Sequence, residues 1–368
     1  MLRRKSASVP RVAIVSEPPD GGVAEHVRWL VQELPTYGYE PVAVVPREFV
    51  HLEEVSTFCD VVTLPFRRDY AHPGDDLGVL AQLVPVLRRA ALVHAHAAKA
   101  GVLARVAAGL ARRPVVYTPH GFPFVGEMSS ARRQFGLFVE RRLAHSTAAM
   151  ICVCEFEREL AARKGVRPRR IAVVHNGCPP CAEVDVVNKT RGLVVGSTST
   201  LRPAKALDCL LDAMPAIRAA VPEARLVIVG DGPLKADLHA RAEALGVDVT
   251  WMPFEQPAAR FLHSFDVYVL SSAWEAFPFG VLEAQACGVP QVVSAVGGTR
   301  ESVAPDTGIL VPPRDPDALA EAVIQLLCDH DRRTAMSAAS RRRHAEYFTV
   351  ERMVAGTAAV YDRVLSHR

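Results

Sequence analysis

The feature that most constrains this fold is an alternation of short apolar strands and helices that stops once and then restarts. The apolar runs are continuous, as in parallel strands covered by helices on both faces. The alternation therefore predicts an α/β fold. The strands expected in the first series are Val12–Val15, Val42–Val45, Asp60–Leu64, Leu92–His94, Val115–Thr118, Met150–Val153 and Ile171–Val174, with helices such as Asp76–Arg89 and Gly101–Ala111.

A second series follows a segment without periodicity between Asn176-Gly177 and Thr190, which we interpret as an interdomain linker. Its expected strands are Leu193–Ser197, Leu226–Val229, Val249–Met252, Val267–Leu270 and Gln291–Ser294, with helices Ala206–Ala219 and Lys235–Leu245 and a strand-free helical stretch, Pro316–His367. A length of 368 residues suits two domains. We expect two doubly wound, Rossmann-like domains facing a cleft, residues 1–180 and residues 190–368, the second ending in a helical segment.

Composition narrows the function classes. Hydrophobic residues make up 49% and charged residues 23% of the chain, as in a soluble globular protein. The net charge of +3 argues against obligate nucleic-acid binding. No apolar run approaches the roughly 18 residues of a membrane span, and Glu17 ends the first apolar run too early for a signal peptide. We therefore expect a cytoplasmic protein whose eight scattered cysteines are reduced thiols.

The strongest candidate site directly follows the strand Val267–Leu270. Pro278 predicts a helix start, because proline lacks the N–H that would be unpaired there. The amides of Phe279 and Gly280 would then point outward at the positive end of the helix dipole, which suits a phosphate. Glu283, about one turn further, could accept hydrogen bonds from two adjacent ribose hydroxyls. Taken alone, Glu275 and Glu283 could be an ordinary helix cap and a residue of a solvated helix face. The preceding strand, Pro278 and Gly280 favour a ligand-binding site instead.

A second candidate, residues 196–205, also lies between a strand end and a helix. Arg202 can bind two oxygens of a diphosphate, and Lys205 adds a compact second charge. Such a pair could neutralise a leaving nucleoside diphosphate without a metal. The alternative is an exposed basic pair at a helix start, where the dipole disfavours cations. That unfavourable placement supports the functional interpretation.

Two weaker candidates belong to the first series. Gly21-Gly22 lies between the first strand and the first helix, where glycines let the backbone approach a ligand closely. The segment is not the GxGxxG dinucleotide fingerprint. His120 follows the strand that ends at Thr118, and a histidine at that position faces a ligand site rather than the core. His94 and His96, on the preceding strand, are expected to pack or to support site residues.

These four segments, in this order and at strand ends, resemble the family-four retaining glycosyltransferases over essentially the whole chain. That family has an E-x7-E element, which here spans Glu275 to Glu283. Further similar stretches are Asn176-Gly177, Gly230-Asp231-Gly232-Pro233, residues 283–293, Gly297-Gly298, Gly308 and Leu310-Val311-Pro312-Pro313. The resemblance implies the GT-B fold and transfer of a hexosyl or N-acetylhexosaminyl group from a UDP- or GDP-sugar with retention of configuration. The expected setting is polysaccharide, glycolipid or glycosylated-metabolite biosynthesis.

The resemblance also implies roles for individual residues. Glu283 would hold the ribose, Gly22 would close on the diphosphate from the other domain, and Phe254 would lie by the base. Glu275 would contact the transferred sugar, and His120 the sugar and the reacting face. The implied donor-binding residues are Gly22, Arg202, Lys205, Phe254, Phe279, Gly280 and Glu283, and the implied catalytic residues are His120 and Glu275.

Two positions depart from the family pattern. Ala206 stands where the family usually has glycine after the lysine, and Pro278 stands where glycine is frequent. The usual mechanism proposed for the family is a front-face reaction in which the leaving phosphate takes the acceptor proton. Such a reaction needs no enzymic nucleophile, and the sequence offers no obvious one. Because Arg202 and Lys205 can neutralise the diphosphate, we expect no metal and no cofactor besides the nucleotide sugar as co-substrate.

The sequence does not identify the acceptor. Residues 129–148 combine four arginines with Phe135, Phe138 and Leu143, so a helix there could lie on an anionic membrane face. A helix packed on the sheet with exposed arginines explains the same residues equally well. A glycan, a lipid-linked or a small-molecule acceptor fits, and so does peripheral contact with the inner membrane face. A GT-B nucleotide-sugar epimerase and a catalytically silent nucleotide-sugar binding subunit are the alternative functions.

Overall fold

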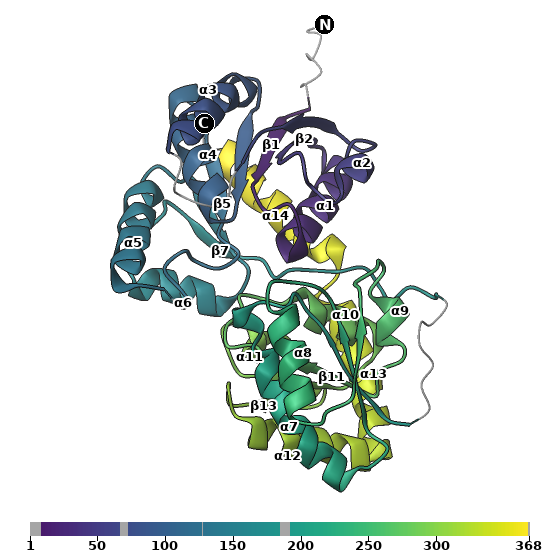
Figure 1. Cartoon of the computed structure of the whole chain (residues 1–368). Helices are drawn as coiled ribbons and strands as arrows, with labels where there is room; N and C mark the ends of the chain where they lie inside the picture. The colour runs from purple at the N-terminus through teal and green to yellow at the C-terminus, as the bar shows by residue number, and fades with distance from the viewer. Residues whose placement is uncertain (1–8, 67–72, 127, 185–191, 367–368) are drawn as a thin grey trace, which may run out of the picture. The chain divides into compact units, whose positions relative to one another are not determined.

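The computed structural model describes residues 9–66, 73–126, 128–184 and 192–366. The chain forms two compact units (Figure 1), one of Met1–His175 with Val350–Arg368 and one of Asn176–Thr349. Each unit holds one parallel sheet with helices on both faces. The α/β class and the doubly wound plan are therefore confirmed. Residues 185–191 of the expected linker lie outside the described residues.

The sheet of the first unit has seven strands in the order β3-β2-β1-β4-β5-β6-β7. Every paired strand runs parallel to its neighbour. The strands are β1 (Arg11–Ser16), β2 (Glu40–Val45), β3 (Asp60–Thr63), β4 (Leu92–His96), β5 (Val115–Thr118), β6 (Ala149–Cys152) and β7 (Ile171–Val173). All seven expected strands are present, and β4 extends two residues beyond its expected end.

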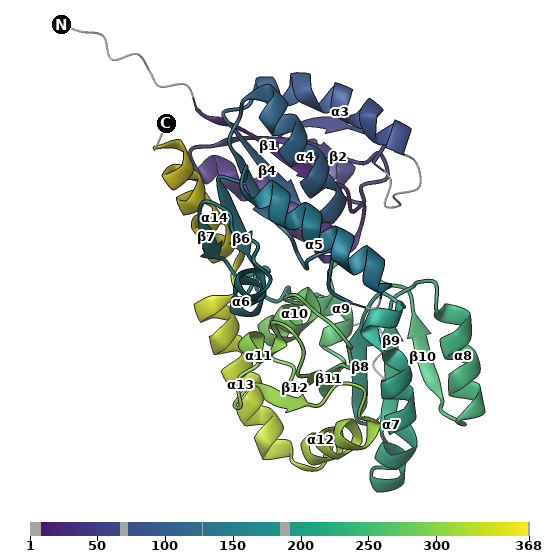
Figure 2. The ribbon, with the colours of Figure 1, turned by 90° about the vertical axis from the view of Figure 1, so that its left-hand side faces the viewer.

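Helices cover both faces of this sheet. Those on one face, α3 to α6, share an apolar core with the inward side of β4 and β5. The other face packs on α1 and α14. The helical elements of this unit are α1 (Gly21–Glu33), η1 (Leu34–Tyr37), α2 (Leu52–Val55), α3 (Pro73–Arg88), α4 (Ala98–Ala111), α5 (Ser130–Ala144), α6 (Glu155–Arg163) and α14 (Val350–Leu365). Figure 2 shows α3, α4 and α5 on the side of the sheet away from α14.

The terminal helix α14 belongs to the first unit, which corrects the domain boundaries expected from the sequence. Its apolar stripe includes Met353, Val354 and Tyr361, all at most 1% exposed. These side chains pack into the core formed with α1 and β1. A stripe at three- and four-residue spacing shows that a helix has a buried face but not which sheet covers it. The first boundary also moves, because the units divide between His175 and Asn176.

The sheet of the second unit has six parallel strands in the order β10-β9-β8-β11-β12-β13. They are β8 (Val194–Thr198), β9 (Arg225–Val229), β10 (Val249–Met252), β11 (Val267–Leu270), β12 (Gln291–Ser294) and β13 (Gly308–Val311). The sequence analysis did not predict β13. It is an edge strand of four residues beginning with glycine, and glycine is a poor strand former.

Two apolar layers enclose this second sheet. One contains side chains of α7, α8 and α12, and the other contains α9 and α10. The helical elements are η2 (Pro203–Lys205), α7 (Leu207–Ala220), α8 (Lys235–Ala244), α9 (Ala259–Leu262), α10 (Phe279–Cys287), α11 (Thr299–Ser302), α12 (Pro316–Cys328) and α13 (His330–Tyr347). Within the described residues, no helix has both the length and the hydropathy needed to cross a bilayer.

One cysteine pair contradicts the expectation of reduced thiols. Cys181 and Cys287 form a disulfide whose Cα atoms are 4.8 Å apart. Cys287 ends α10, so the bond ties the segment after Asn176 to that helix. The two residues are 106 positions apart in the sequence, and only the fold brings them together. Cys178 is a buried thiol whose Sγ lies 3.4 Å from His344 Nε2.

Candidate active site

Both sheets have a switch point, where the strand order reverses and the loops after two neighbouring strands diverge. In the second unit the switch point lies between β8 and β11. In the first unit it lies between β1 and β4. The loops at the carboxyl ends of these strands carry most of the residues predicted from the sequence.

In the second unit, the loop after β11 contacts η2 and brings two predicted residues together. Lys205 Nζ donates to Glu275 Oε1 at 2.5 Å. Ser272 Oγ also donates to Glu275 Oε1, at 2.6 Å. The Lys205 side chain is 23% exposed and that of Glu275 is 9% exposed. A half-buried ammonium beside a buried carboxylate retains further N–H donors for a ligand.

Two glycines after β9 allow the loop of residues 199–202 to pack directly against their backbone. A Cβ on Gly230 would stand 1.9 Å from Ser199 O, and one on Gly232 would stand 2.6 Å from Leu201 O. Leu201 N donates to Asp231 O at 2.9 Å. The backbones of the two loops are therefore in direct contact, which side chains would prevent. The Gly230-Asp231-Gly232-Pro233 stretch thus supports the loop that carries Arg202.

Arg202 is exposed and lies next to η2, which contains Lys205. Its backbone is extended, with φ −125° and ψ 157°. Ala206, which follows Lys205, has a left-handed backbone with φ 43° and ψ 45°. An L-amino acid side chain is disfavoured in that region, and glycine is not. The left-handed backbone therefore explains why the family usually has glycine at this position.

Helix α10 begins at Phe279, and Pro278 is its N-cap residue with φ −76°. That angle is close to the value that the proline ring imposes, so Pro278 is unstrained. No side chain of the described residues caps the helix, and the first amides of a helix have no intrahelical acceptor. The predicted anion site at Phe279 and Gly280 therefore has the expected backbone.

Gly280 allows α10 to approach the end of β8. A Cβ at this position would stand 2.3 Å from the Tyr268 hydroxyl oxygen and 3.3 Å from Thr198 Oγ1. The hydroxyls of Ser197 and Thr198 are buried and make no hydrogen bond within the described residues. Unsatisfied buried hydroxyls are uncommon in folded proteins. Polar groups at this edge thus have spare hydrogen-bonding capacity.

Glu283 lies on α10 and is half-buried. Burial raises the pKa of the neighbouring Tyr268, and the negative charges of Glu283 and Glu275 raise it further. Both predicted glutamates therefore lie near one buried tyrosine. Gly297 packs closely against this loop, because a Cβ there would stand 1.8 Å from the carbonyl oxygen of Glu275. The E-x7-E element is thus enclosed by groups from several segments.

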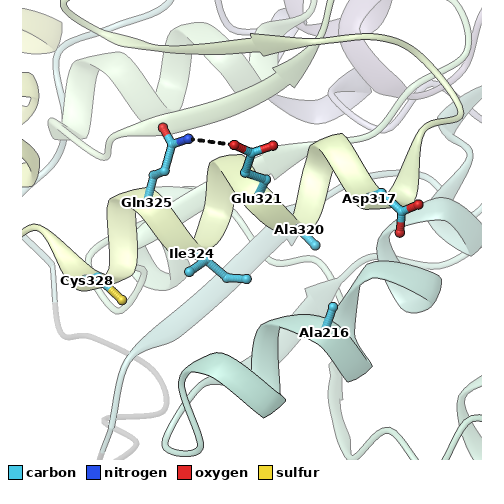
Figure 3. Close-up of a pocket in the computed structure, with 7 residues that line it drawn as sticks. All are labelled: Ala216, Asp317, Ala320, Glu321, Ile324, Gln325 and Cys328. Atoms are coloured by element: carbon cyan, nitrogen blue, oxygen red, sulfur yellow. Dashed lines mark hydrogen bonds between the residues drawn. The ribbon is translucent and has the colours of Figure 1, made fainter.

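Phe254 lies apart from these contacts, in the loop after β10. Its side chain is 43% exposed, and its ring centroid is 6.4 Å from that of Phe261. An exposed ring at the carboxyl end of a strand could stack on a base. A surface groove elsewhere in this unit is lined by Ala216 of α7 and by residues of α12 (Figure 3). None of the predicted site residues lines that groove.

In the first unit, Gly21 and Gly22 are the first two residues of α1 and both are exposed. Gly21 has a φ of 76°, which favours glycine. The preceding Glu17 is buried and accepts a hydrogen bond from Ala100 N at 2.9 Å, at the start of α4. The loop between β1 and α1 is therefore attached to the neighbouring helix. Gly22 therefore lies at the start of α1, after the strand β1 that borders the switch point.

His120 has a left-handed backbone with φ 51°, which is uncommon for a residue with a side chain. The next residue, Gly121, donates its N–H to Glu157 Oε1 at 2.5 Å. Glu157 is only 2% exposed, and its Oε2 accepts from Val153 N at 2.9 Å. A buried carboxylate on α6 therefore fixes the backbone next to His120. Strained backbone of this kind is concentrated at functional sites.

The His120 side chain contacts two further histidines. Its Nε2 lies 3.0 Å from His96 Nδ1, and its ring meets His26 edge-on with centroids 4.7 Å apart. Burial lowers the pKa of His120 and of His96 well below the ordinary value, and neighbouring histidines lower both further. These imidazoles are therefore neutral at pH 7. His94 is fully buried between Tyr361 and Thr118, which agrees with a packing role.

Sequence reasoning missed Glu157, His26 and Ser272. Glu157 and His26 lie on helices that start after strands, and nothing in their helical spacing distinguishes them from other polar residues. Ser272 follows β11 directly, so its position at a strand end was available as a signal. The predicted residues group by unit: Arg202, Lys205, Phe254, Glu275, Phe279, Gly280 and Glu283 in the second, and Gly22 and His120 in the first.

Comparison with known families agrees with this division. Residues 21–177 match the glycosyl transferase 4-like domain. Residues 191–329 match the family model described as glycosyl transferases group 1. The first match lies within the first unit apart from Asn176 and Gly177, and the second lies within the second unit. Each unit thus has its own counterpart in one family of enzymes.

Individual proteins similar to this chain are also glycosyltransferases. The chain is 30% identical to the UDP-Gal:alpha-D-GlcNAc-diphosphoundecaprenol alpha-1,3-galactosyltransferase of Escherichia coli, over 69% of this chain and 71% of the relative. It is 32% identical to a GDP-mannose-dependent alpha-(1-6)-phosphatidylinositol dimannoside mannosyltransferase of Mycobacterium tuberculosis, over 64% of each chain. A D-inositol 3-phosphate glycosyltransferase of Salinispora tropica is 30% identical over 75% of this chain and 65% of its own length. The last two alignments span just under two thirds of the relatives.

Solved structures confirm the fold. A sucrose-phosphate synthase from Thermosynechococcus elongatus superimposes with a TM-score of 0.84 at 19% identity, over 98% of this chain and all of that chain. The Anabaena protein HepE in complex with UDP gives a TM-score of 0.79 at 21% identity, over 96% of this chain and all of that chain. Together with the family matches and the Escherichia coli relative, these findings show that the chain belongs to the family-four glycosyltransferases, nucleotide-sugar-dependent enzymes of the GT-B fold.

Proposed function

We propose that this glycosyltransferase moves a hexosyl group from a UDP- or GDP-sugar to an acceptor hydroxyl with retention of configuration. The observation that supports it most directly is the Lys205–Glu275 pair at the switch point of the second sheet. There a cation, a carboxylate and an uncapped helix start come from adjacent strand ends. A cation and helix amides suit a diphosphate, and a carboxylate suits sugar hydroxyls.

In this proposal the second unit holds the donor. Arg202 and Lys205 bind the diphosphate, together with the amides of Phe279 and Gly280. Glu283 accepts two hydrogen bonds from the ribose, and Phe254 stacks on the base. The exposed position of Arg202 and the half-buried positions of Lys205 and Glu283 support these roles, because all three side chains are accessible to a ligand.

Three further residues contact the transferred sugar or the diphosphate attached to it. Glu275 contacts its hydroxyls, His120 contacts the sugar at the reacting face, and Gly22 contacts the diphosphate. Lys205 donates to both Glu275 and the diphosphate, since an ammonium has three N–H groups. The leaving phosphate takes the acceptor proton as the acceptor oxygen attacks, so the positive groups stabilise the charge that develops on the diphosphate. A neutral His120 can donate or accept one hydrogen bond in that step.

The surface of α5 supports a lipid-linked acceptor. Phe135 and Phe138 are 65% and 62% exposed, and Arg142 lies on the same face of the helix at i+7 from Phe135. Exposed aromatic rings beside arginines are typical of helices that lie on anionic membranes. Two of the relatives are named for acceptors on diphosphoundecaprenol or phosphatidylinositol. We therefore propose a peripheral location at the inner membrane face. Glycan and small-molecule acceptors are the alternatives.

Co-sedimentation of the full chain with vesicles tests the membrane contact. Phosphatidylglycerol vesicles should bind the wild type, and phosphatidylcholine vesicles should not. The double variant Phe135→Ser and Phe138→Ser should lose this binding. Leu110→Ser, which changes a 63% exposed side chain on α4 of the same unit, should keep it. Equal binding by all three proteins would rule out α5 as the contact.

A donor and acceptor panel tests the transfer itself. UDP- and GDP-hexoses are incubated with lipid-linked and inositol acceptors, and products are identified by mass spectrometry and NMR. We expect acceptor-dependent product whose anomeric configuration matches that of the donor. Isomerised donor without acceptor would instead indicate an epimerase. Nucleotide binding without hydrolysis or transfer would indicate a binding subunit.

A further inference from the structure

Three histidines of the first unit meet at the carboxyl edge of its sheet. His26 lies on α1, His96 ends β4 and His120 follows β5. One ring nitrogen of each lies within 4.8 Å of the others. His26 and His96 are buried, and His120 is half-buried. The three side chains come from separate elements, so the fold itself assembles the cluster.

The spacing of the rings is close to that of a metal site. His96 Nδ1 and His120 Nε2 are 3.0 Å apart, and the His26 ring centroid lies 5.2 Å from that of His96. In a tetrahedral zinc site with bonds of about 2.0–2.1 Å, ligand nitrogens stand roughly 3.3 Å apart. The 3.0 Å between His96 Nδ1 and His120 Nε2 and the 4.8 Å limit for the whole group bracket that distance. His96 Nε2 is buried and has no hydrogen-bond partner within the described part of the chain.

Neighbouring groups are less suited to a metal. The His94 ring centroid lies 4.0 Å from that of His96, and the two rings are at an angle of 43°. Its two nitrogens are already hydrogen-bonded to Tyr361 and Thr118, at 2.6 and 2.8 Å. Another group of possible ligands, Cys181, His263 and Cys287, contains two sulfurs joined as a disulfide. Those sulfurs are not thiolates while the bond is intact, and the thiolate is the form that binds a metal.

We propose that His26, His96 and His120 bind one divalent transition-metal ion of the zinc class and that this ion inhibits the transferase. Three imidazoles favour zinc, nickel or copper over magnesium or calcium, which prefer oxygen ligands. With three protein ligands, a fourth position stays open to water. The inhibition, but not the binding, rests on the proposed function, in which His120 contacts the sugar. When the Nε2 of His120 binds a metal, that nitrogen can no longer hydrogen-bond to the sugar.

Zinc calorimetry on the full chain, without reductant, tests the binding. We expect one zinc ion per chain. His26→Gln should weaken zinc binding at least tenfold, while His145→Gln, an exposed histidine of the same unit, should leave it unchanged. His263→Gln should also leave it unchanged. Wild-type affinity in a folded His26→Gln, or loss in His263→Gln instead, would overturn the site.

Cobalt gives an independent measurement on the wild type, which does not depend on how a variant folds. Tetrahedral Co²⁺ with nitrogen ligands absorbs visible light much more strongly than aqueous Co²⁺. We expect this absorption to saturate at one equivalent and to disappear when zinc is added. Absorption no stronger than that of the aqueous ion would contradict the site.

Activity then tests the second part of the proposal. Zinc should inhibit wild-type transfer with the midpoint found for binding, and His26→Gln should need at least tenfold more zinc. Full activity of the zinc-loaded enzyme would overturn the inhibition and leave the metal site standing. If the protein shows no transfer with any donor, the proposed function fails, whereas the calorimetry and cobalt results still decide the metal site.

Discussion

Two residues that depart from the family pattern have opposite conformational consequences. Pro278 has a φ of −76°, which its ring favours, at a position that needs no N–H from it. Ala206 has a φ of 43°, where its Cβ is disfavoured by about 1–2 kcal/mol. The backbone thus explains why proline replaces glycine at one position without strain, whereas alanine at the other is strained next to Lys205.

Ala206→Gly should raise the stability of the second unit. Removing the Cβ relieves the left-handed strain, and the greater freedom of glycine in the unfolded chain offsets part of the gain. We expect a net increase of about 0.5–1 kcal/mol in the free energy of unfolding, measured by urea denaturation. Ala216→Gly, in the middle of α7, is the control and should lower stability by about 0.5–1 kcal/mol. A loss of stability in both variants would contradict the strain.

His120→Asn should reduce transfer while leaving nucleotide binding intact. Asparagine tolerates the left-handed backbone of this position, so the variant tests the ring and not the backbone. His120 belongs to the first unit, and the side chains proposed to hold the nucleotide all belong to the second. We expect kcat and kcat/KM to fall together, by at least tenfold, with little change in the Kd of the nucleoside diphosphate.

The control for His120→Asn is His145→Asn, which changes an exposed histidine of the same unit. It should have normal turnover. A His120→Asn protein with a lowered Tm but normal turnover in the folded fraction would make His120 a packing residue, and it would then leave the proposed site.

A buried ion pair between Arg105 and Glu140 links helix α5 to helix α4. Arg105 of α4 donates to both carboxylate oxygens of Glu140 at 2.8 and 2.9 Å, and both side chains are fully buried. Tyr117 of β5 also donates to Glu140, at 3.2 Å. The guanidinium carbon of Arg105 lies 3.9 Å from the centre of the Tyr117 ring. The network therefore joins α4, β5 and α5, and it holds the helix whose outer face carries Phe135 and Phe138.

Glu140→Gln should destabilise the first unit strongly. The substitution leaves the Arg105 charge buried without its counter-ion, which typically costs about 3–5 kcal/mol. Urea denaturation followed by circular dichroism measures the loss. Glu159→Gln removes half of an exposed ion pair on α6 and should cost less than about 1 kcal/mol. Equal stability of the two variants would show that the buried network contributes little.

Most strands were predictable because parallel strands covered on both faces are short, continuous apolar runs with polar ends. The placement of α14 was not, since its apolar stripe would fit either sheet. The edge strand β13 was not predicted either, because it is short and begins with glycine, a poor strand former. Local sequence thus predicted which segments are strands and helices, while their partners depend on contacts between residues far apart in the chain.

Site residues at strand ends were predictable for a related reason. Lys205, Glu275 and His120 each follow a strand of a doubly wound sheet, and ligands bind at that edge. Glu157 and His26 lie on helices and reach the carboxyl edge of the first sheet, next to His120. Only the folded chain shows that Glu157 contacts Gly121 and that His26 contacts His120. The Lys205–Glu275 contact joins positions 70 residues apart, so neither residue alone indicated it.

We expect the complete enzyme to transfer the sugar without a metal. Arg202 and Lys205 supply the positive charge that a metal would otherwise place on the leaving diphosphate. Transfer should therefore continue in excess EDTA, and it should rise if the enzyme carries inhibitory zinc at the three histidines. Steady-state assays before and after dialysis against EDTA measure this. Loss of turnover that magnesium or manganese restores would assign the diphosphate charge to a metal.

In the proposed function, the second unit binds the donor nucleotide through the end of β8 and the start of α10. Calorimetric titration of the full chain with UDP and GDP, in EDTA, tests it most directly. Glu283→Ala removes two ribose hydrogen bonds to a carboxylate, each worth about 1.5–3 kcal/mol, so the Kd should rise at least tenfold. Glu243→Ala, an exposed glutamate of α8, should bind like the wild type. Unchanged affinity in a folded Glu283→Ala would contradict the claim.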